Sequence, residues 1–278
     1  MRANGVSSRT RAAHYAGLAR RSLYYRLKDG PAVRPREDEP RVRRAIRRVA
    51  LAHASFGYRR VWAILRHREG LAINRKRVRR LMRVEGLTRP AHLPRPRLPA
   101  TGRLIADVPN TRWYTDLTDV ETTDRGTGLL MAILDGCTRE VVSWEFFSQC
   151  LASDAARVLE TAVLARFPTV GHAESLVLVT DQGSQFTARS FREAAARLGV
   201  EHRVTRTRRP EDNGLQESFH GHLKADYLWL REPESFLATR ATVAEAIQDY
   251  NEERPHSSLD YLTPVEFARQ QSKEASKT

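Results

Sequence analysis

Four prolines within twelve residues, in the stretch TRPAHLPRPRLP at positions 88–99, constrain the fold of this chain more than any other feature. Proline cannot continue a helix and removes a donor from a central strand, so no regular element crosses this stretch. Such a segment is typical of a semi-rigid, extended linker. The sequence therefore predicts separate folded parts on either side, and 278 residues allow one of them a sizeable core.

The charge of the chain is distributed unevenly. Residues 1–103 contain 28 Lys and Arg against 6 Asp and Glu, a net charge of +22, whereas residues 104–278 carry −8. A polycationic part joined to a mildly acidic part is typical of a nucleic-acid-binding module attached to another domain. A solvated helical surface or a basic arm is the alternative that charge alone leaves open.

Several classes of protein are disfavoured by the sequence. No apolar run approaches the length of a membrane span, and no hydrophobic stretch follows the Arg-rich N-terminus. Two cysteines, Cys137 and Cys150, provide neither a disulfide framework nor a metal cluster. We therefore expect a soluble intracellular protein without a membrane partner.

The basic part has helical periodicity. Apolar residues recur at helical spacing over residues 41–53 and 58–68, and Asn74 is a typical cap for a third helix that ends at Gly86. Three short helices suit a helix-turn-helix that lays its third helix on DNA, although many small bundles have basic surfaces. The residues of the third helix that we expect to contact DNA are Arg75, Lys76, Arg77, Arg79, Arg80 and Arg83.

The part that follows the linker has the sequence pattern of several consecutive β-strands. Runs rich in β-branched and aromatic residues are separated by Gly and Asp turns, which first predicts a three-stranded antiparallel meander. A helix capped by Ser153 comes next, and the order βββαβαβ predicts an α/β domain with a mixed five-stranded sheet. The expected strands are 112–121, 128–134, 140–147, 175–179 and 201–205, and the expected helices are 153–167 and 189–198.

Three carboxylates occupy positions suited to a shared site. Asp116 lies in the first strand, Asp181 follows the fourth strand at a glycine turn, and Glu217 falls in the first turns of a helix that starts near Asp212. In a twisted α/β sheet, the strands of Asp116 and Asp181 can be neighbours. Taken alone, Asp181 also fits a simple turn residue and Glu217 a solvated helix residue.

Carboxylates gathered in one cleft repel one another unless they are protonated or bridged by cations. Ligation by oxygen alone favours Mg²⁺ or Mn²⁺ over zinc. Two such ions can activate an attacking hydroxyl and stabilise the leaving oxygen of a phosphodiester.

Other residues near these acids have simpler interpretations. Asp119 points to the opposite side of its strand from Asp116, because it is an odd number of residues away, and Asp135 opens a turn. We expect Trp113 in the core. We expect His220 and His222 on the helix surface or facing DNA.

Three motifs together resemble the catalytic core of DDE transposases and retroviral integrases. They are Asn110-x-x-Trp113-x-x-Asp116-x-Thr118, then Thr180-Asp181-Gln-Gly-Ser-Gln-Phe, then Asp212-Asn213-x-x-x-Glu217-Ser218-Phe219. Thirty-five residues lie between Asp181 and Glu217, an interval typical of this group. The chain is most similar to a bacterial insertion-sequence family whose transposase is assembled from two overlapping reading frames, and it resembles the downstream frame.

The resemblance covers residues 41–267. The tail reads Tyr250-Asn-x-x-Arg-Pro-His-x-x-Leu-x-Tyr-x-Thr-Pro-x-x-Phe, and the basic part begins Phe56-Gly-Tyr-Arg-Arg-Val. Thr180 stands where the family has serine, and Gly214 where it has alanine. Neither departure removes a ligand.

This resemblance implies an RNase H-like fold in which Asp116, Asp181 and Glu217 are catalytic and hold two divalent ions, Mg²⁺ or Mn²⁺. The implied activity is cleavage of DNA at the element's ends, followed by attack of the freed 3′-hydroxyl on target DNA. Lys224 matches the basic residue that holds the terminal phosphates, and a solvated helix lysine is its alternative reading.

The implied partners are double-stranded DNA, at the element's terminal repeats and at the target, and an oligomer assembled on that DNA. Fusion to or association with the upstream-frame product is also implied, since this sequence shows no sustained heptad pattern of its own. The implied location is the bacterial cytoplasm, at the nucleoid.

Two other functions stay open. One is a nuclease of the same fold that hydrolyses RNA–DNA hybrids, and the other is a non-catalytic DNA-binding repressor derived from a transposase. The parts we predict are a basic N-terminal segment and linker (1–40), a helix-turn-helix-like DNA-binding domain (41–88), a Pro-rich linker (89–108), an RNase H-like integrase core (109–228) and a C-terminal helical extension (229–278).

Overall fold

The computed structural model of the chain describes residues 39–88, 106–121, 126–169, 171–173, 175–205, 214–231 and 235–275. The chain divides into two compact units, residues 1–44 and 45–278. The expectations for the first 38 residues, for most of the Pro-rich linker and for the helix start at Asp212 and Asn213 lie outside the described residues.

The basic part contains the three expected helical segments. These are α2 (Glu39–Ala52), α3 (Tyr58–Ala63), which continues as the π-helix η2 (Ile64–Arg68), and α4 (Arg75–Val84). The apolar stripe of α4 is fully buried, as periodicity predicted, at Val78, Leu81 and Met82.

Both ends of α4 have the predicted chemistry. The side chain of Asn74 accepts a hydrogen bond from the backbone N–H of Lys76 at 2.8 Å, which satisfies one of the free donors of the first turn. Gly86 has φ +68°, a left-handed conformation that glycine adopts without strain. The next amide, of Leu87, then donates to the carbonyl of Met82 at 2.8 Å and closes the helix.

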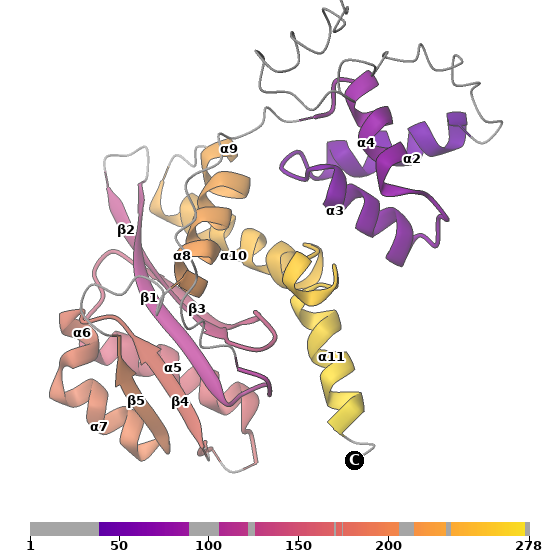
Figure 1. Cartoon of the computed structure of the whole chain (residues 1–278). Coiled ribbons are helices and arrows are strands. Elements are labelled where there is room, and N and C mark those ends of the chain that lie inside the picture. The colour runs from indigo at the N-terminus through magenta and orange to yellow at the C-terminus, as the bar shows by residue number, and fades with distance from the viewer. Residues whose placement is uncertain are drawn as a thin grey trace, which may run out of the picture. The chain divides into compact units, whose positions relative to one another are not determined.

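A mixed five-stranded sheet forms the centre of the larger unit (Figure 1), as the element order predicted. Its strands run in the order β3-β2-β1-β4-β5. Neighbours β1, β2 and β3 pair antiparallel, whereas β4 is parallel to both β1 and β5. The strand bounds are β1 (Arg112–Glu121), β2 (Thr127–Asp135), β3 (Val141–Phe147), β4 (Leu176–Thr180) and β5 (Val200–Val204).

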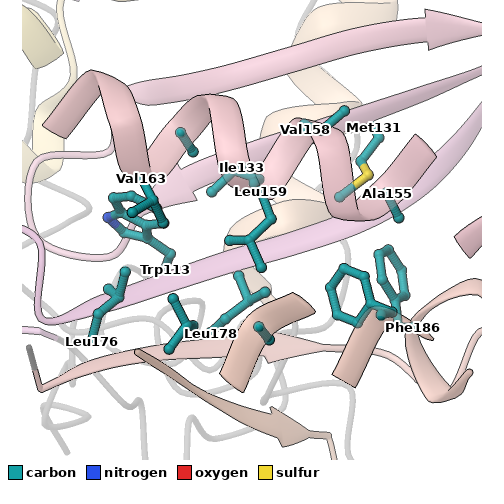
Figure 2. Packing of buried hydrophobic residues seen from close by; sticks show 14 of the residues in the cluster. Trp113, Met131, Ile133, Ala155, Val158, Leu159, Val163, Leu176, Leu178 and Phe186 are labelled. Atoms are coloured by element: carbon teal, nitrogen blue, oxygen red, sulfur yellow. The ribbon is translucent and has the colours of Figure 1, made fainter. Parts of the chain in front are cut away.

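Three helices cover one face of this sheet: α5 (Ala152–Arg166), α6 (Ser184–Thr187) and α7 (Arg189–Arg197). Figure 2 shows the core beneath them, where Trp113, Met131 and Leu159 are fully buried. Trp113 is therefore a core residue, as predicted.

The predicted cap of the helix after β3 was wrong. Leu151 precedes α5, and its backbone N–H donates to the carboxylate of Asp154 at 3.0 Å. Ser153 lies inside the first turn. An acidic residue at the third helical position reaches back to the first free amide, and this satisfies the helix end without a serine cap.

The opposite face of the sheet carries a second core. Alternate residues of β2 point to the two faces, so Met131 and Ile133 enter the first core while Leu130 and Leu134 enter the second. The segments that cover this face or follow from it are α8 (Gly214–Leu223), the π-helix η4 (Lys224–Leu228), α9 (Trp229–Arg231), α10 (Phe236–Glu252), the short η5 (Ser257–Leu259) and α11 (Pro264–Ala275).

Strand β2 is buried on both faces because one core lies on each side of the sheet. This explains why its sequence is a continuous apolar run rather than an alternating one.

Among the helices of the described segments, none combines the length and the apolar character needed to cross a lipid bilayer.

Candidate active site

Two of the predicted acids lie at matching positions on neighbouring strands. In the parallel pair β1–β4, Arg112 stands beside Val177 and Tyr114 beside Val179. Continuing this register by two residues puts Asp116 beside Asp181, which directly follows β4. Both carboxylates are half-buried, so they are sheltered yet reachable from solvent.

A tight turn holds Asp181. Its Oδ1 accepts a hydrogen bond from the backbone N–H of Gly183 at 3.0 Å. A Cβ at Gly183 would lie 2.2 Å from the side-chain Nε2 of Gln185, which can move aside, and 3.0 Å from Asp181 Oδ1. The glycine that follows the buried strand therefore supplies the backbone donor that holds the Asp181 carboxylate.

His202 supports the strand end from the other side. Its Nε2 lies 2.9 Å from the hydroxyl of Thr180, and the same hydroxyl contacts the backbone carbonyl of Asp181 at 2.8 Å. Burial, and then the charge of Arg192, lower the pKa of His202 below its ordinary value. A neutral imidazole therefore packs against the residue that precedes Asp181.

The helix that carries Glu217 is fastened to the sheet by its neighbour. Gln216 is fully buried, and its Nε2 donates to the carbonyl of Tyr114 at 2.7 Å and to that of Ala132 at 3.0 Å. Ala132 is the residue of β2 that pairs with Asp116. These two bonds tie the first turn of α8 to β1, the strand of Asp116, and to its neighbour β2. Glu217 itself is exposed.

Further along, the same helical run is anchored to α10. The carboxylate of Asp226 accepts from Arg254 at 3.0 Å, and both side chains are buried. Tyr227 donates its hydroxyl proton to Asp249. Asn251 then bonds through its side-chain amide to both the N–H and the carbonyl of Val141, at 2.9 and 3.0 Å, which fixes the end of α10 to β3.

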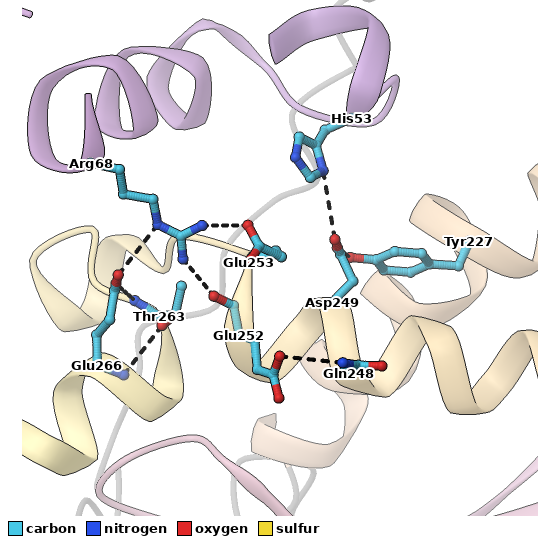
Figure 3. A network of polar contacts seen from close by, with 9 residues as sticks. All are labelled: His53, Arg68, Tyr227, Gln248, Asp249, Glu252, Glu253, Thr263 and Glu266. Carbon is cyan, nitrogen blue, oxygen red and sulfur yellow. Dashed lines mark hydrogen bonds and ion pairs between the residues drawn. The ribbon is translucent and has the colours of Figure 1, made fainter.

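The tail motif is thus largely architectural. Thr263 and Glu266 form a reciprocal capping box at the start of α11, with bonds of 2.8 and 3.2 Å, and Pro264 occupies the first helical position. Figure 3 shows that Arg68 contacts Glu253 and lies 3.3 Å from Glu266. These contacts stabilise the segment that follows α10.

The donor chemistry of the three acids fits a hard divalent cation, since all are carboxylates and all are at least partly open to solvent. Across the described ranges, however, no three His, Cys, Asp or Glu side chains are close enough together to hold one ion. The fold aligns Asp116 with Asp181 and anchors the helix of Glu217 beside them, but it does not gather the three carboxylates into one cluster.

The expectation that His220 lies on the helix surface was wrong. His220 is buried and His222 half-buried, because α10 and the tail cover this side of α8. Burial, helped by Lys224, lowers the pKa of His220 to about 4. Burial, helped first by Arg254, does the same for His222.

Asp135 has the turn role that was predicted for it. Asp135 is buried in a turn, where its Oδ1 accepts from the backbone N–H groups of Cys137 and Thr138 at 2.9 and 2.7 Å. Asp119 is exposed, three residues beyond Asp116 on β1.

The basic residues of α4 divide into two groups. Arg75, Lys76, Arg79 and Arg83 are exposed, whereas Arg77 and Arg80 are half-buried. Two of the exposed guanidinium groups stack on aromatic rings, since Arg79 lies 5.5 Å from the ring centre of Tyr58 and Arg75 5.8 Å from that of Trp62. Lys224 is half-buried, at the junction of α8 and η4.

Comparison with protein families gives matches on both sides of the Pro-rich linker. The integrase core domain matches residues 106–210, and a second family of the same description matches residues 198–264. An HTH-like domain matches residues 36–95.

Two relatives from Escherichia coli are similar along most of the chain. "Transposase InsD for insertion element IS2A/D/F/H/I/K" is 36% identical over 226 residues, which cover 78% of this chain and 75% of the relative. The transposase InsD of insertion element IS2-9 is also 36% identical, over 78% of this chain and 73% of its own length.

Among solved structures, the intasome of simian T-cell lymphotropic virus contains a similar chain, with a TM-score of 0.50 at 16% identity. The match covers 81% of this chain and 74% of that one. At such low identity the likeness shows the fold alone, which is the integrase-type, RNase H-like fold that the resemblance implied.

Proposed function

Because the chain belongs to the family of insertion-element transposases with an integrase core, we propose that Asp116, Asp181 and Glu217 form the active site with which it cuts element ends and joins them to target DNA. The chain is a DDE-type polynucleotidyl transferase by family. We propose which residues carry this activity and what each of them does.

The parallel register of β1 and β4 is the observation that carries the proposal. A continuation of that pairing aligns Asp116, in the middle of β1, with Asp181, which directly follows the end of β4. An alignment of this kind has no packing purpose, because two unbridged carboxylates side by side repel each other. The turn at Gly183 and the bonds of Gln216 supply the support that a catalytic arrangement needs.

We propose two divalent ions, Mg²⁺ or Mn²⁺, held by the three carboxylates. When bound, such ions activate the attacking oxygen and stabilise the charge that develops on the phosphate and on the leaving oxygen. In this arrangement Asp116 would offer oxygen ligands from the middle of β1, Asp181 from the turn after β4, and Glu217 from helix α8. Lys224, two turns beyond Glu217, would attract the phosphates next to the scissile bond.

The basic helices provide the other half of the activity. We propose that the exposed residues of α4 contact DNA phosphates of the terminal repeats, with Arg77 and Arg80 contributing from the edge of the helix. The domain division at residues 40, 88, 108 and 228 is part of the same proposal, and the HTH-like match over residues 36–95 supports its DNA-binding part. Oligomerisation on DNA, association with the upstream-frame product and work at the nucleoid in the cytoplasm complete it.

A strand-transfer assay tests the proposal against its rivals. The purified chain, alone and fused to the upstream-frame product, is incubated with a labelled element end carrying a free 3′-hydroxyl, a supercoiled target and Mg²⁺. Joined products are expected, and more of them from the fused form. Hydrolysis of RNA–DNA hybrids without joining would favour the nuclease, and binding without any chemistry would favour the repressor.

A further inference from the structure

Gln216 is not one of the proposed ligands, but it directly precedes Glu217 in the sequence. It is fully buried between α8 and the sheet, although a long polar side chain at such a position loses its hydration. Its amide nitrogen bonds two backbone carbonyls on different strands, Tyr114 of β1 and Ala132 of β2. Within the described part of the chain, its Oε1 has no hydrogen-bond partner.

The two carbonyls surround Asp116. Tyr114 precedes Asp116 by two residues on the same strand, and Ala132 is its partner across the β1–β2 ladder. An apolar residue at position 216 would fill the same space, but it would let α8 slide or rotate by small amounts. Two directed bonds remove that freedom, because each N–H must point at one fixed oxygen.

We propose that Gln216 is a positioning residue, which sets the rotation of α8 against β1 and β2 and thereby aims Glu217 at Asp116. The inference rests on the proposed function, since it concerns how one member of the triad is placed. Adjacent residues of a helix point about 100° apart, so fixing the direction of Gln216 toward the sheet also fixes the direction of Glu217. The neighbouring side chain acts on the ligand without touching DNA or the ion.

Polar side chains further along the same helical run also hold it in a fixed position. His220, one turn after Gln216, is also buried, and its low pKa keeps the imidazole neutral at working pH. Beyond it, Asp226 and Tyr227 fasten the same run of helix to α10. The helix is therefore held at both ends, and Gln216 is the contact nearest to Glu217.

The test replaces Gln216 by methionine, which keeps the length of the side chain and removes both donors. Gln248→Met is the matched control, because Gln248 is exposed on α10. The full chain is used, and Mn²⁺ binding is followed by the loss of the free-ion signal in electron paramagnetic resonance. Single-turnover cleavage of an end substrate is measured over a series of Mn²⁺ concentrations, with DNA affinity and thermal unfolding recorded for each variant.

For Gln216→Met we expect the Mn²⁺ concentration at half-saturation to rise about 10- to 100-fold, the range typical when a group that orients a ligand is removed. High Mn²⁺ should restore most of the cleavage rate, while DNA affinity stays that of the unchanged chain. Gln248→Met should leave all of these values unchanged. If Gln216→Met does not fold, Gln216→Glu is measured instead. A buried glutamic acid stays protonated, so this variant keeps the shape of the side chain and one of its two donors.

Glu217→Gln, measured in parallel, separates this inference from the proposed function. If Glu217→Gln still cleaves DNA, the proposed triad is wrong. If Glu217→Gln is inactive and Gln216→Met binds Mn²⁺ as the unchanged chain does, the triad stands and the positioning role is wrong. A loss of cleavage in Gln216→Met that high Mn²⁺ does not restore, with unchanged Mn²⁺ binding, also overturns the positioning role.

Discussion

The buried ion pair between Asp226 and Arg254 should be the most sensitive electrostatic contact of the larger unit. The side chains are 7% and 2% exposed and their charged atoms lie 3.0 Å apart, with Arg60 at 3.5 Å from the same carboxylate. Arginine cannot release its proton, so Asp226→Ala leaves the buried Arg254 cation without the carboxylate that it contacts. Breaking a buried pair in this way costs about 3–5 kcal/mol, a large fraction of the stability of an ordinary domain.

Urea unfolding at neutral pH and physiological salt, followed by tryptophan fluorescence, measures this loss. The matched control is Glu193→Ala, which breaks a pair with Arg189 whose side chains are 55% and 90% exposed. That change should cost less than about 1 kcal/mol, because water screens exposed charges. If Asp226→Ala costs no more than Glu193→Ala, the Asp226–Arg254 pair does not anchor η4 to the tail.

Three further results are expected. Changing Arg79 and Arg83 to alanine should lower the slope of log affinity against log salt by about 0.9 for each lost phosphate contact, measured by fluorescence anisotropy, and an unchanged slope would remove α4 from the DNA interface. Asn74→Ala should lower the free energy of unfolding by about 1 kcal/mol, as measured by thermal unfolding, because α4 loses its cap. His220 and His222 have folded pKa values of about 4, below those of the unfolded chain. The unfolded chain therefore binds more protons, and stability should be fully present above pH about 6.5 and fall toward pH 4. His222→Gln should flatten that fall, and an equally steep one would contradict the pKa assignment.

Features written in short stretches of sequence were predictable. The cap at Asn74, the stop at Gly86 and the meander of three strands depend on neighbours within a few residues, and all of them are confirmed. The adjacency of the strands of Asp116 and Asp181 was also expected, because connections in α/β sheets allow few arrangements.

Features set by distant parts of the chain were not predictable. His220 reads as a surface residue until α10 and the tail cover it, and Gln216 reads as an ordinary helix residue until its amide meets two strands. The π-helical segments η2 and η4 likewise follow from packing rather than from local propensity. The start of α11 could have been predicted from the sequence, because Thr263 and Glu266 have the spacing of a capping box and Pro264 is typical of a first helical position.

The central claim is that three carboxylates, and not acids of this surface in general, carry the chemistry. A single cleavage assay with Mg²⁺ on one labelled element end, comparing Asp116→Asn with Asp119→Asn, tests it most directly, because both changes remove one charge from the same strand. Asp181→Asn and Glu217→Gln complete the set, and DNA binding is measured for every variant. We predict that Asp119→Asn cleaves like the unchanged chain, while each triad variant binds DNA but loses cleavage and strand transfer, with double variants no worse than single ones. Cleavage by Glu217→Gln or Asp116→Asn at a rate comparable with that of the unchanged chain would contradict the account.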